Sequence, residues 1–402
     1  MTSLARDTRL LLCARAARSI GQGALIVTFA LYLRALGWSA GSIGGLFTVG
    51  LLIDALLTTL SGPLSDRLGR RRFLLMFESV QIAAALAALC SSQTWILGVA
   101  AVAGGFGRGA NGSSGPFAPV ELSWLSQPLA AAERGRVYSL NMAIGFSGMA
   151  VGAVLGGLPA VFDTWLSGAM AFRPLFGLSL VGSLACLLLL SLAADRPTEA
   201  PPTRTPAGEA QQRDENSLLF KLFGINALNG VAIGLVGPLM AYWFAVRYGK
   251  GPADIGWVMA LAYVVTAASS LFAGRLVDRV GVVRSVVWMR GLGLVILLAL
   301  PLMPTFWLAS VLHVARSALN RGTAGARQAL TVSLVRPHRR GTAASTSSVA
   351  IQLPRAAGPL FAGLLFGSGY LAAPFYIAAG FFGAYIVFFA RTFARHDPSR
   401  PK

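Results

Sequence analysis

The chain has 402 residues, of which 55% are hydrophobic and 12% are charged, and its mean hydropathy is +0.65. A soluble globular domain, in which roughly 25% of the residues are charged, is therefore excluded. The 34 lysines and arginines outnumber the 15 aspartates and glutamates, which gives a formal net charge of +19. In a membrane protein such an excess marks the cytoplasmic loops, so we expect the lipid bilayer, and no nucleic acid, as a partner.

The sequence patterns that would indicate an enzyme are missing. Three cysteines and three histidines are scattered without metal-site spacing, and there is no glycine-rich nucleotide-binding loop ending in Lys-Ser or Lys-Thr. No Ser/His/Asp or Cys/His arrangement can be proposed either. We expect no cofactor, no metal site and no catalytic activity.

Twelve apolar windows are long enough to cross a hydrocarbon core of about 30 Å as helices of about 20 residues. In chain order they cover residues 17–36, 42–62, 73–91, 95–115, 138–160, 172–193, 222–245, 253–274, 285–303, 305–325, 343–366 and 370–392. The basic segment before the first window has no cleavage motif, which favours a retained helix over a signal peptide. The predicted fold class is an all-α polytopic membrane protein with twelve transmembrane helices.

A polar, proline-rich stretch divides these windows six and six. We predict an N-terminal six-helix bundle (residues 1–193), a cytoplasmic linker (residues 194–221) and a C-terminal six-helix bundle (residues 222–402). Two motifs of the first half recur in the second: Gly62-Pro-Leu-Ser-Asp66-Arg67-Leu-Gly69 as Gly274-Arg-Leu-Val-Asp278-Arg279-Val-Gly281, and Arg108-Gly-Ala-Asn-Gly112 as Arg321-Gly-Thr-Ala-Gly325. A duplicated unit predicts pseudo-symmetric bundles with the functional site at their interface.

Basic residues predict the orientation of the helices. They gather before the first window, in residues 67–72, in the linker and at the C-terminus, whereas the opposite loops hold only Arg34, Arg173, Arg247 and Lys250. Because lysine and arginine are retained on the cytoplasmic side, both termini are expected to be cytoplasmic. The expected location is the inner (plasma) membrane.

The loop from Gly62 to Arg72 matches almost completely the signature loop of the major facilitator superfamily, which the chain resembles over essentially its whole length. This resemblance implies two six-helix bundles that work by alternating access, with the loop as a conformational latch between them. The residues assigned to the latch are Gly62, Asp66, Arg67, Gly69, Arg70 and Arg71, with Asp278 and Arg279 in a weakened second copy. The alternative is that the arginines only hold the orientation of the helices.

Arg108 and the following Gly112 are similar to a motif of the proton-coupled drug and metabolite exporters in this family. An arginine inside the membrane needs a partner or a wet cavity, and Asp54, the only acidic residue placed deep in any window, is the natural partner. One hypothesis makes Asp54 a proton-binding carboxylate controlled by Arg108. The other is a permanent salt bridge that holds two helices together.

Small residues predict close helix packing in the fifth and eleventh windows. Gly148, Gly152, Gly156 and Gly157 form a small-residue face, and Gly358-Pro359 lies in the second half. The first set is similar to an antiporter motif of the family, with Ala153 in place of its proline. Simple helix packing remains the alternative to a role in coupling.

The tenth and eleventh windows carry polar stripes that are expected to face one cavity. His313, Arg316 and Asn320 share a helix face with Arg327, and Gln352 shares one with Arg355, while Arg321 repeats Arg108. Tyr32 and Tyr242 are candidate aromatic contacts for the substrate. Such a cavity is electropositive and suits an anionic or zwitterionic compound, although the arginines could instead be structural.

Together these features predict a monomeric secondary transporter that exports a small organic compound, anionic or amphiphilic, in exchange for protons. Uptake or exchange of an organic anion is the alternative within transport. A lipid or lysolipid translocase and a non-transporting membrane sensor are alternatives of another class.

Overall fold

The computed structural model describes residues 6–108, 115–127, 131–194, 209–324, 327, 330–331 and 340–393, and the regular elements in this part of the chain are helices without a strand. The first half contains α1 (Arg6–Ala35), α2 (Ala40–Leu68), α3 (Arg70–Cys90), α4 (Thr94–Gly104), α5 (Phe117–Ser126), α6 (Ala131–Leu155), α7 (Pro159–Phe162), the short 3-10 helix η1 (Gly168–Phe172) and α8 (Pro174–Leu192). The second half contains α9 (Glu209–Val236), α10 (Met240–Tyr248), α11 (Pro252–Val280), α12 (Val282–Ala299), η2 (Leu300–Leu302), α13 (Phe306–Gly322), α15 (Arg340–Gly367) and α16 (Ala373–Phe393). The predicted all-α fold class is confirmed.

Ten of the twelve predicted windows lie in described helical segments that are long and apolar enough to cross a membrane. The exceptions are the windows at 95–115 and 305–325. The first is not one helix: α4 ends because Gly105 and Gly107 have positive φ angles of 65° and 71°, and the chain becomes helical again in α5. The second is the 17-residue α13, which carries a polar face.

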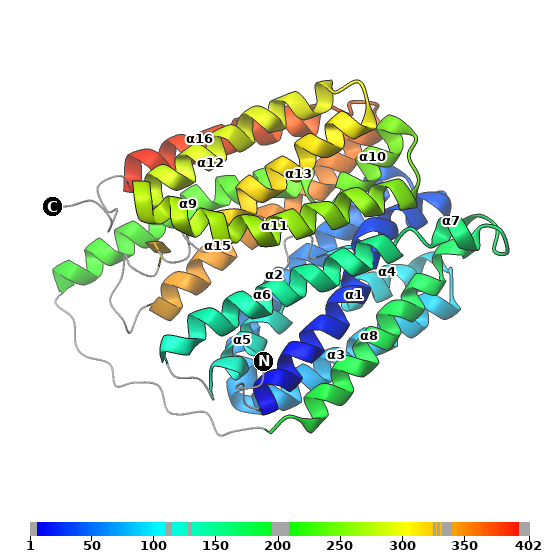
Figure 1. Ribbon diagram of the computed structural model, residues 1–402, viewed down its shortest axis with the longest axis horizontal. Helices are drawn as coiled ribbons and strands as arrows, with labels where there is room; N and C mark the ends of the chain where they lie inside the picture. Colours follow the sequence, from blue (N-terminus) through cyan, green and yellow to red (C-terminus); the bar gives the residue numbers. More distant parts are fainter. Residues whose placement is uncertain are drawn as a thin grey trace.

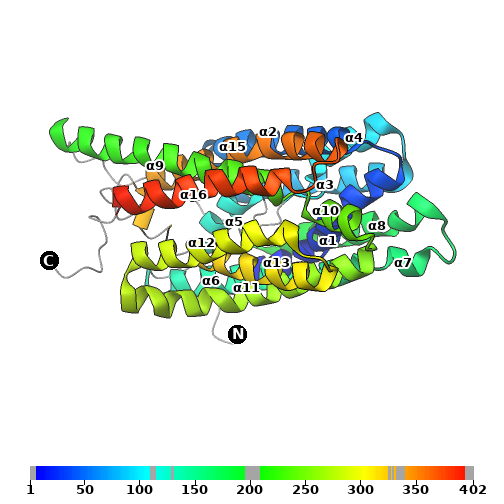
Figure 2. The same cartoon turned by 90° about the horizontal axis from the view of Figure 1, so that it is seen from above.

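The two halves form two helix bundles, drawn in Figure 1 with α1, α3, α6 and α8 in the lower part and α11, α12, α13 and α16 in the upper part. Within the first bundle α1 packs against α6 and α8, and within the second α9 packs against α15 and α16. The bundles meet along two seams, α2 with α15 and α6 with α11, which lie on opposite sides of the molecule in Figure 2. Because α2 corresponds to α11 in the sequence repeat, the two seams are related by pseudo-symmetry.

Both seams have backbone contacts near the end that holds the α1–α2 turn at residues 36–39, which we call the closed end. In one seam a Cβ at Gly44 would overlap the carbonyl oxygen of Pro359. In the other, a Cβ at Gly256 would overlap the carbonyl oxygen of Ala153. Small residues thus allow backbone contact between the halves at this end of both seams.

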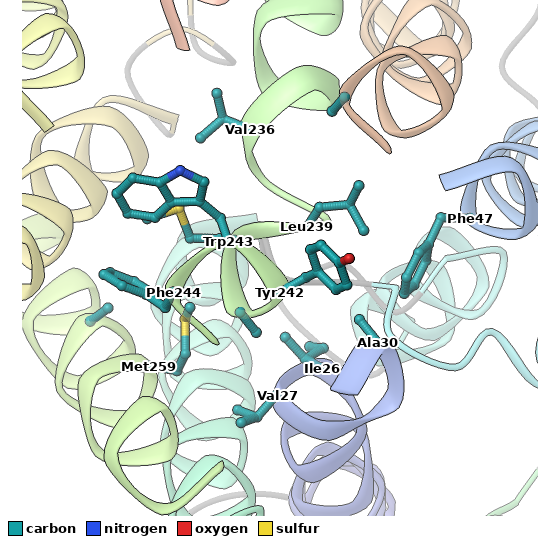
Figure 3. Close-up of a cluster of buried hydrophobic side chains, with 14 of the residues drawn as sticks. Ile26, Val27, Ala30, Phe47, Val236, Leu239, Tyr242, Trp243, Phe244 and Met259 are labelled. Carbon is teal, nitrogen blue, oxygen red and sulfur yellow. The ribbon is translucent and has the colours of Figure 1, made fainter. Parts of the chain in front are cut away.

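An aromatic and aliphatic cluster fills the space between the seams near the closed end (Figure 3). Tyr242 and Leu239 of the second half lie opposite Ile26, Ala30 and Phe47 of the first half. All five side chains are at least nine-tenths buried. The cluster closes this end by apolar packing, together with a hydrogen bond across the α2–α15 seam from the Leu360 backbone N–H to Thr48 Oγ1 at 3.1 Å.

Replacing Gly44 by alanine is expected to open the closed end, because the new methyl group cannot share space with the Pro359 carbonyl. The readout is the rate at which an impermeant maleimide labels Ala30→Cys in a background without native cysteines, and that rate should rise. Gly98→Ala is the matched control, since a Cβ at this helical position meets nothing within 4 Å. Equal labelling of the two variants would contradict the proposed steric contact.

Candidate functional site

Asp54 and Arg108 lie together where the fourth span is broken. The Asp54 Oδ1 and Arg108 Nη1 atoms are 3.6 Å apart, and both side chains are nearly buried. Arg108 also donates from Nη1 to the Gly50 carbonyl and from Nη2 to the Val102 carbonyl at 2.7 Å. Irregular backbone at membrane depth is tolerated where it lines a cavity, which is what the break at Gly105 does here.

The cavity beside this pair also receives a side chain from the other half. Arg355 of α15 lines it together with Asp54 and Arg108. The Arg355 side chain is buried and donates from Nη1 to Gln352 Oε1 at 3.0 Å. The α2–α15 seam therefore brings an arginine of the second half to the cavity that holds Asp54 and Arg108 of the first half.

A second, larger cavity of about 270 Å³ lies between α6 and the helices of the second half. Its described polar lining is Asn229, Tyr263, Arg290, His313, Arg316, Ser317, Asn320, Arg321 and Arg327. The structure thus brings together the predicted residues of the tenth window, because all of them lie on one face of α13 or directly after it. We call this space the arginine cavity.

Gln352 and Arg355 do not join this group. The polar stripes of the tenth and eleventh windows were expected to converge on one cavity, but Arg355 lines the cavity of Asp54, and neither residue lines the arginine cavity. The reason is that α15 packs lengthwise between α2 and α9, which directs Arg355 toward the α2 seam. The polar residues of the tenth and eleventh windows therefore line two separate cavities, where one was expected.

Tyr32 and Tyr242 are also placed away from both cavities. Tyr32 is 1% exposed and its ring packs against Phe172 and Phe176 in the first bundle. Tyr242 stacks on Phe366 with the ring centroids 6.2 Å apart, in the cluster at the closed end. Their described contacts are those of packing residues.

Arg290 of α12 was not singled out from the sequence. Its Nη1 donates to Asn229 Oδ1 at 2.8 Å, and its guanidinium lies over the rings of Phe382 and Tyr385, 5.1 and 5.4 Å from their centroids. The side chain is 2% exposed and lines the arginine cavity. Its position inside an apolar window was the available signal, since arginine at such depth marks a functional site by default.

Two further ion pairs are buried in the first bundle. Arg18 Nε lies 2.7 Å from Glu78 Oε1, and Arg15 Nη1 lies 3.9 Å from Glu121 Oε2. Glu78 is fully buried and Glu121 is 2% exposed, against 9% for Asp54. Asp54 was the only acid expected deep in the helices, and Glu78 and Glu121 are also buried inside the bundle, each beside an arginine of α1, which begins at residue 6.

The predicted latch lies at the end opposite the closed end, around the turn between α2 and α3. Asp66 has a side chain that is 60% exposed, 4.0 Å from Arg70. Arg70 donates to the Ser123 carbonyl at 3.2 Å and Arg71 donates to the Ser191 carbonyl. The described contacts of these arginines thus tie α3 to α5 and α8 within one bundle.

The glycines of the latch motif have different roles. Gly69 and Gly281 have φ angles of 88° and 92°, which L side chains rarely adopt, so each copy of the motif needs glycine at its helix-breaking turn. Gly62 lies inside α2, where a Cβ would meet nothing within 4 Å, so close packing does not require glycine at this position. Arg67 and Arg279 are exposed, and the side chain of Asp278 lies outside the described residues.

The glycine face of α6 packs against α1. Cβ atoms at Gly148, Gly152 and Gly156 would contact α1, with direct overlap at Gly152, whereas Gly157 faces Ala253 of the other half. In α15 a Cβ at Gly358 would overlap the α9 backbone at Gly234, and the carbonyl of Pro359 meets Gly44 of α2. These residues hold helices close together both within and between the bundles.

Two pseudo-symmetric helix bundles with buried charges and cavities at their interface define a polytopic membrane transporter. The chain matches the model of the Major Facilitator Superfamily over residues 11–221 and 222–402, and it belongs to this family. Its family and fold are those of transporters, which are not enzymes.

Individual relatives are distant in sequence. The multidrug resistance protein MdtG of Proteus mirabilis is 24% identical over 360 residues, covering 86% of this chain and 83% of that protein. The crystal structure of a D-xylose-proton symporter superposes with a TM-score of 0.73 at 15% identity, over 95% of this chain and 96% of that chain. A bacterial homologue of the human lysosomal transporter Spinster, inward-facing and occupied, gives a TM-score of 0.72 at 16% identity over 97% of both chains. The likeness to MdtG fits the exporter branch of the family.

Proposed function

We propose that this protein is a proton-coupled transporter that exports a small organic anion by alternating access. The observation that carries the proposal is the charge of the arginine cavity: four arginines and a histidine line it, with no carboxylate among its described lining residues. Forked guanidinium groups suit carboxylate and phosphate oxygens, and their charge repels cations. The cavity lies between the bundles, where rocking one half against the other changes its exposure.

We propose that the cavity of Asp54 couples transport to protons. A carboxylate paired with Arg108 in a cavity that Arg355 also lines links the charge state of the first half to a side chain of the second. When Asp54 takes up a proton, its attraction to Arg355 is lost, and the α2–α15 seam is weakened. This supplies a physical route from protonation to movement of the bundles.

The distribution of charge supports the proposed orientation, and the likeness to exporters supports the proposed direction of transport. With both termini cytoplasmic in the inner membrane, the closed end faces outward, and in this conformation the arginine cavity would exchange with the cytoplasm. Export is supported by the exporter-like motif at Arg108 and by the likeness to MdtG. The chain is proposed to act as a monomer.

Binding of benzoate is expected to raise the melting temperature of the purified protein, whereas benzylamine, of similar shape and opposite charge, should not. Arg316→Gln should weaken benzoate binding about tenfold or more, since hydrogen bonds to a charged group contribute about 1.5–3 kcal/mol. Arg284→Gln, on an exposed position of α12, is the matched control. If benzylamine stabilises the protein as well as benzoate does, the anion proposal is wrong.

A further inference from the structure

The walls of the arginine cavity differ in chemistry between the two halves. Among the described lining residues, those of the first half are apolar: Ile26, Met142 and Phe146. The cationic side chains in the described lining come from the second half, on α12 and on or directly after α13. A molecule held there meets an apolar wall on one side and guanidinium groups on the other.

The arginines of this cavity differ from those of the first bundle in how their charge is offset. In the first bundle Arg15, Arg18 and Arg108 each have a carboxylate oxygen within 4 Å. In the arginine cavity, Arg290 is held by an amide oxygen and two ring faces, and Arg321 lies over a ring face. Ring faces and amides orient a guanidinium without neutralising it.

Several buried polar atoms around this cavity lack a hydrogen-bond partner among the described residues. They are Nδ2 of Asn229, Nε of Arg290, Nδ1 of His313, Nε of Arg316, Oδ1 of Asn320, Nη1 of Arg321 and Nε of Arg327. Most of them are donors, and buried donors left without acceptors are costly. Because the residues that carry these donors line one cavity, the ligand that fits is rich in acceptor oxygens.

One carboxylate offers two oxygens and one charge, which leaves most of this set unpaired and the cavity strongly positive. A phosphate monoester offers three terminal oxygens and nearly two charges. Guanidinium groups bind such oxygens in pairs through their fork of N–H donors. The count of donors and of charges therefore favours a doubly charged head over a single carboxylate.

We propose that the transported anion is an amphiphile with a phosphate-monoester-like, doubly charged head against α12 and α13 and a small apolar body against α1 and α6. This rests on the proposed anion transport and narrows its substrate class. A molecule in that orientation contacts both halves at once, with a different chemical group toward each. Its head contacts the arginines of the second half, and its apolar body contacts the first half. Binding of the substrate is thereby linked to the relative position of the bundles.

The test uses four probes that separate charge from apolar body: benzyl alcohol, inorganic phosphate, benzoate and phenyl phosphate, each titrated at about pH 8, where the phosphate ester carries two charges. Phenyl phosphate should bind at least about tenfold more tightly than benzoate or inorganic phosphate, because only it satisfies both walls. Dodecyl phosphate as a fifth probe distinguishes a lipid source from a soluble one. If dodecyl phosphate binds more tightly than phenyl phosphate, the substrate is a lipid with the same phosphate-monoester head.

Two variants test the proposed orientation. Arg316→Gln should remove the preference for phenyl phosphate over benzoate. Met142→Ala should weaken phenyl phosphate and leave inorganic phosphate unchanged, with the exposed Met76→Ala as the matched control.

Each outcome separates this inference from the proposal on which it rests. If benzoate binds as tightly as phenyl phosphate, the doubly charged head is wrong while anion transport stands. If inorganic phosphate binds as tightly as phenyl phosphate, the apolar body is wrong. If no anion binds, the proposed function itself fails.

Discussion

Replacing Glu78 by glutamine is expected to lower the free energy of unfolding by about 3–5 kcal/mol, the cost of breaking a buried ion pair on one side. Glu78 is fully buried on α3, and its Oε1 lies 2.7 Å from Arg18 Nε. Glutamine keeps the shape of the side chain and removes its charge. Arg18 would then remain buried as a cation, with the rings of Phe117 and Phe77, 4.3 and 5.3 Å from its guanidinium carbon, as weaker partners.

The measurement is the unfolding midpoint of the purified protein in a detergent titration. Asp66→Asn is the control for removing an acid from an exposed ion pair, where a change of about 0–1 kcal/mol is expected. The double variant Glu78→Gln with Arg18→Gln should recover part of the loss, since no buried charge is then left without a partner. If Glu78→Gln is as stable as the parent protein, the pair is not ionic in the folded state.

The fold could be predicted from the sequence because hydropathy and the repeat depend on local composition. Windows of apolar residues indicated the helices, and the paired glycines of the repeat mark turns with the same left-handed backbone in both halves, at Gly69 and Gly281. The break at Gly105 was missed, because glycine in an apolar window is as compatible with close helix packing as with a helix end. The break brings Arg108 beside Asp54, a contact between residues far apart in the sequence.

The candidate site was predicted in part, and there is a physical reason why some of its residues were placed correctly and others were not. The residues of α13 came together because a helical period alone places them on one face. Arg355 was assigned to the wrong cavity because its neighbour depends on the α2–α15 seam, a contact between residues far apart in the sequence. The burial of Arg15 and Arg18 could not be predicted from the sequence, because their buried partners, Glu121 and Glu78, are set by tertiary packing.

The two halves treat buried arginine in opposite ways, which suggests a division of labour. In the first half the arginines of the ion pairs have acidic partners, so their charge serves to hold helices or to exchange a proton. In the second half Arg290 and Arg316 line a cavity whose described lining has no acid, so their charge is left for a ligand. Asp54 and Arg355 are the described place where these two systems meet.

Replacing Asp54 by asparagine is expected to abolish the response of transport to a pH gradient while leaving ligand binding in the arginine cavity intact. Asparagine preserves the shape of the side chain but cannot take up or release a proton, so the link between the proton gradient and the α2–α15 seam is lost. Because Asp54 does not line the arginine cavity, the affinity for benzoate should stay that of the parent protein. The measurement is benzoate flux in proteoliposomes with and without an imposed pH gradient, together with binding.

Asp254→Asn is the matched control, because this acid lies in the first turn of α11 with a side chain that is 40% exposed, paired to Lys250 at 3.5 Å. It should keep both the flux and its dependence on the gradient.

If Asp54→Asn keeps gradient-driven flux, the aspartate is the structural partner of Arg108 and the proton is carried by another group. If instead the variant loses stability together with flux, the salt bridge at 3.6 Å holds α2 to the broken fourth span, and Arg108→Gln should show the same loss. Ligand binding without gradient response is the one result that assigns the proton to Asp54, since a purely structural pair would not separate the two.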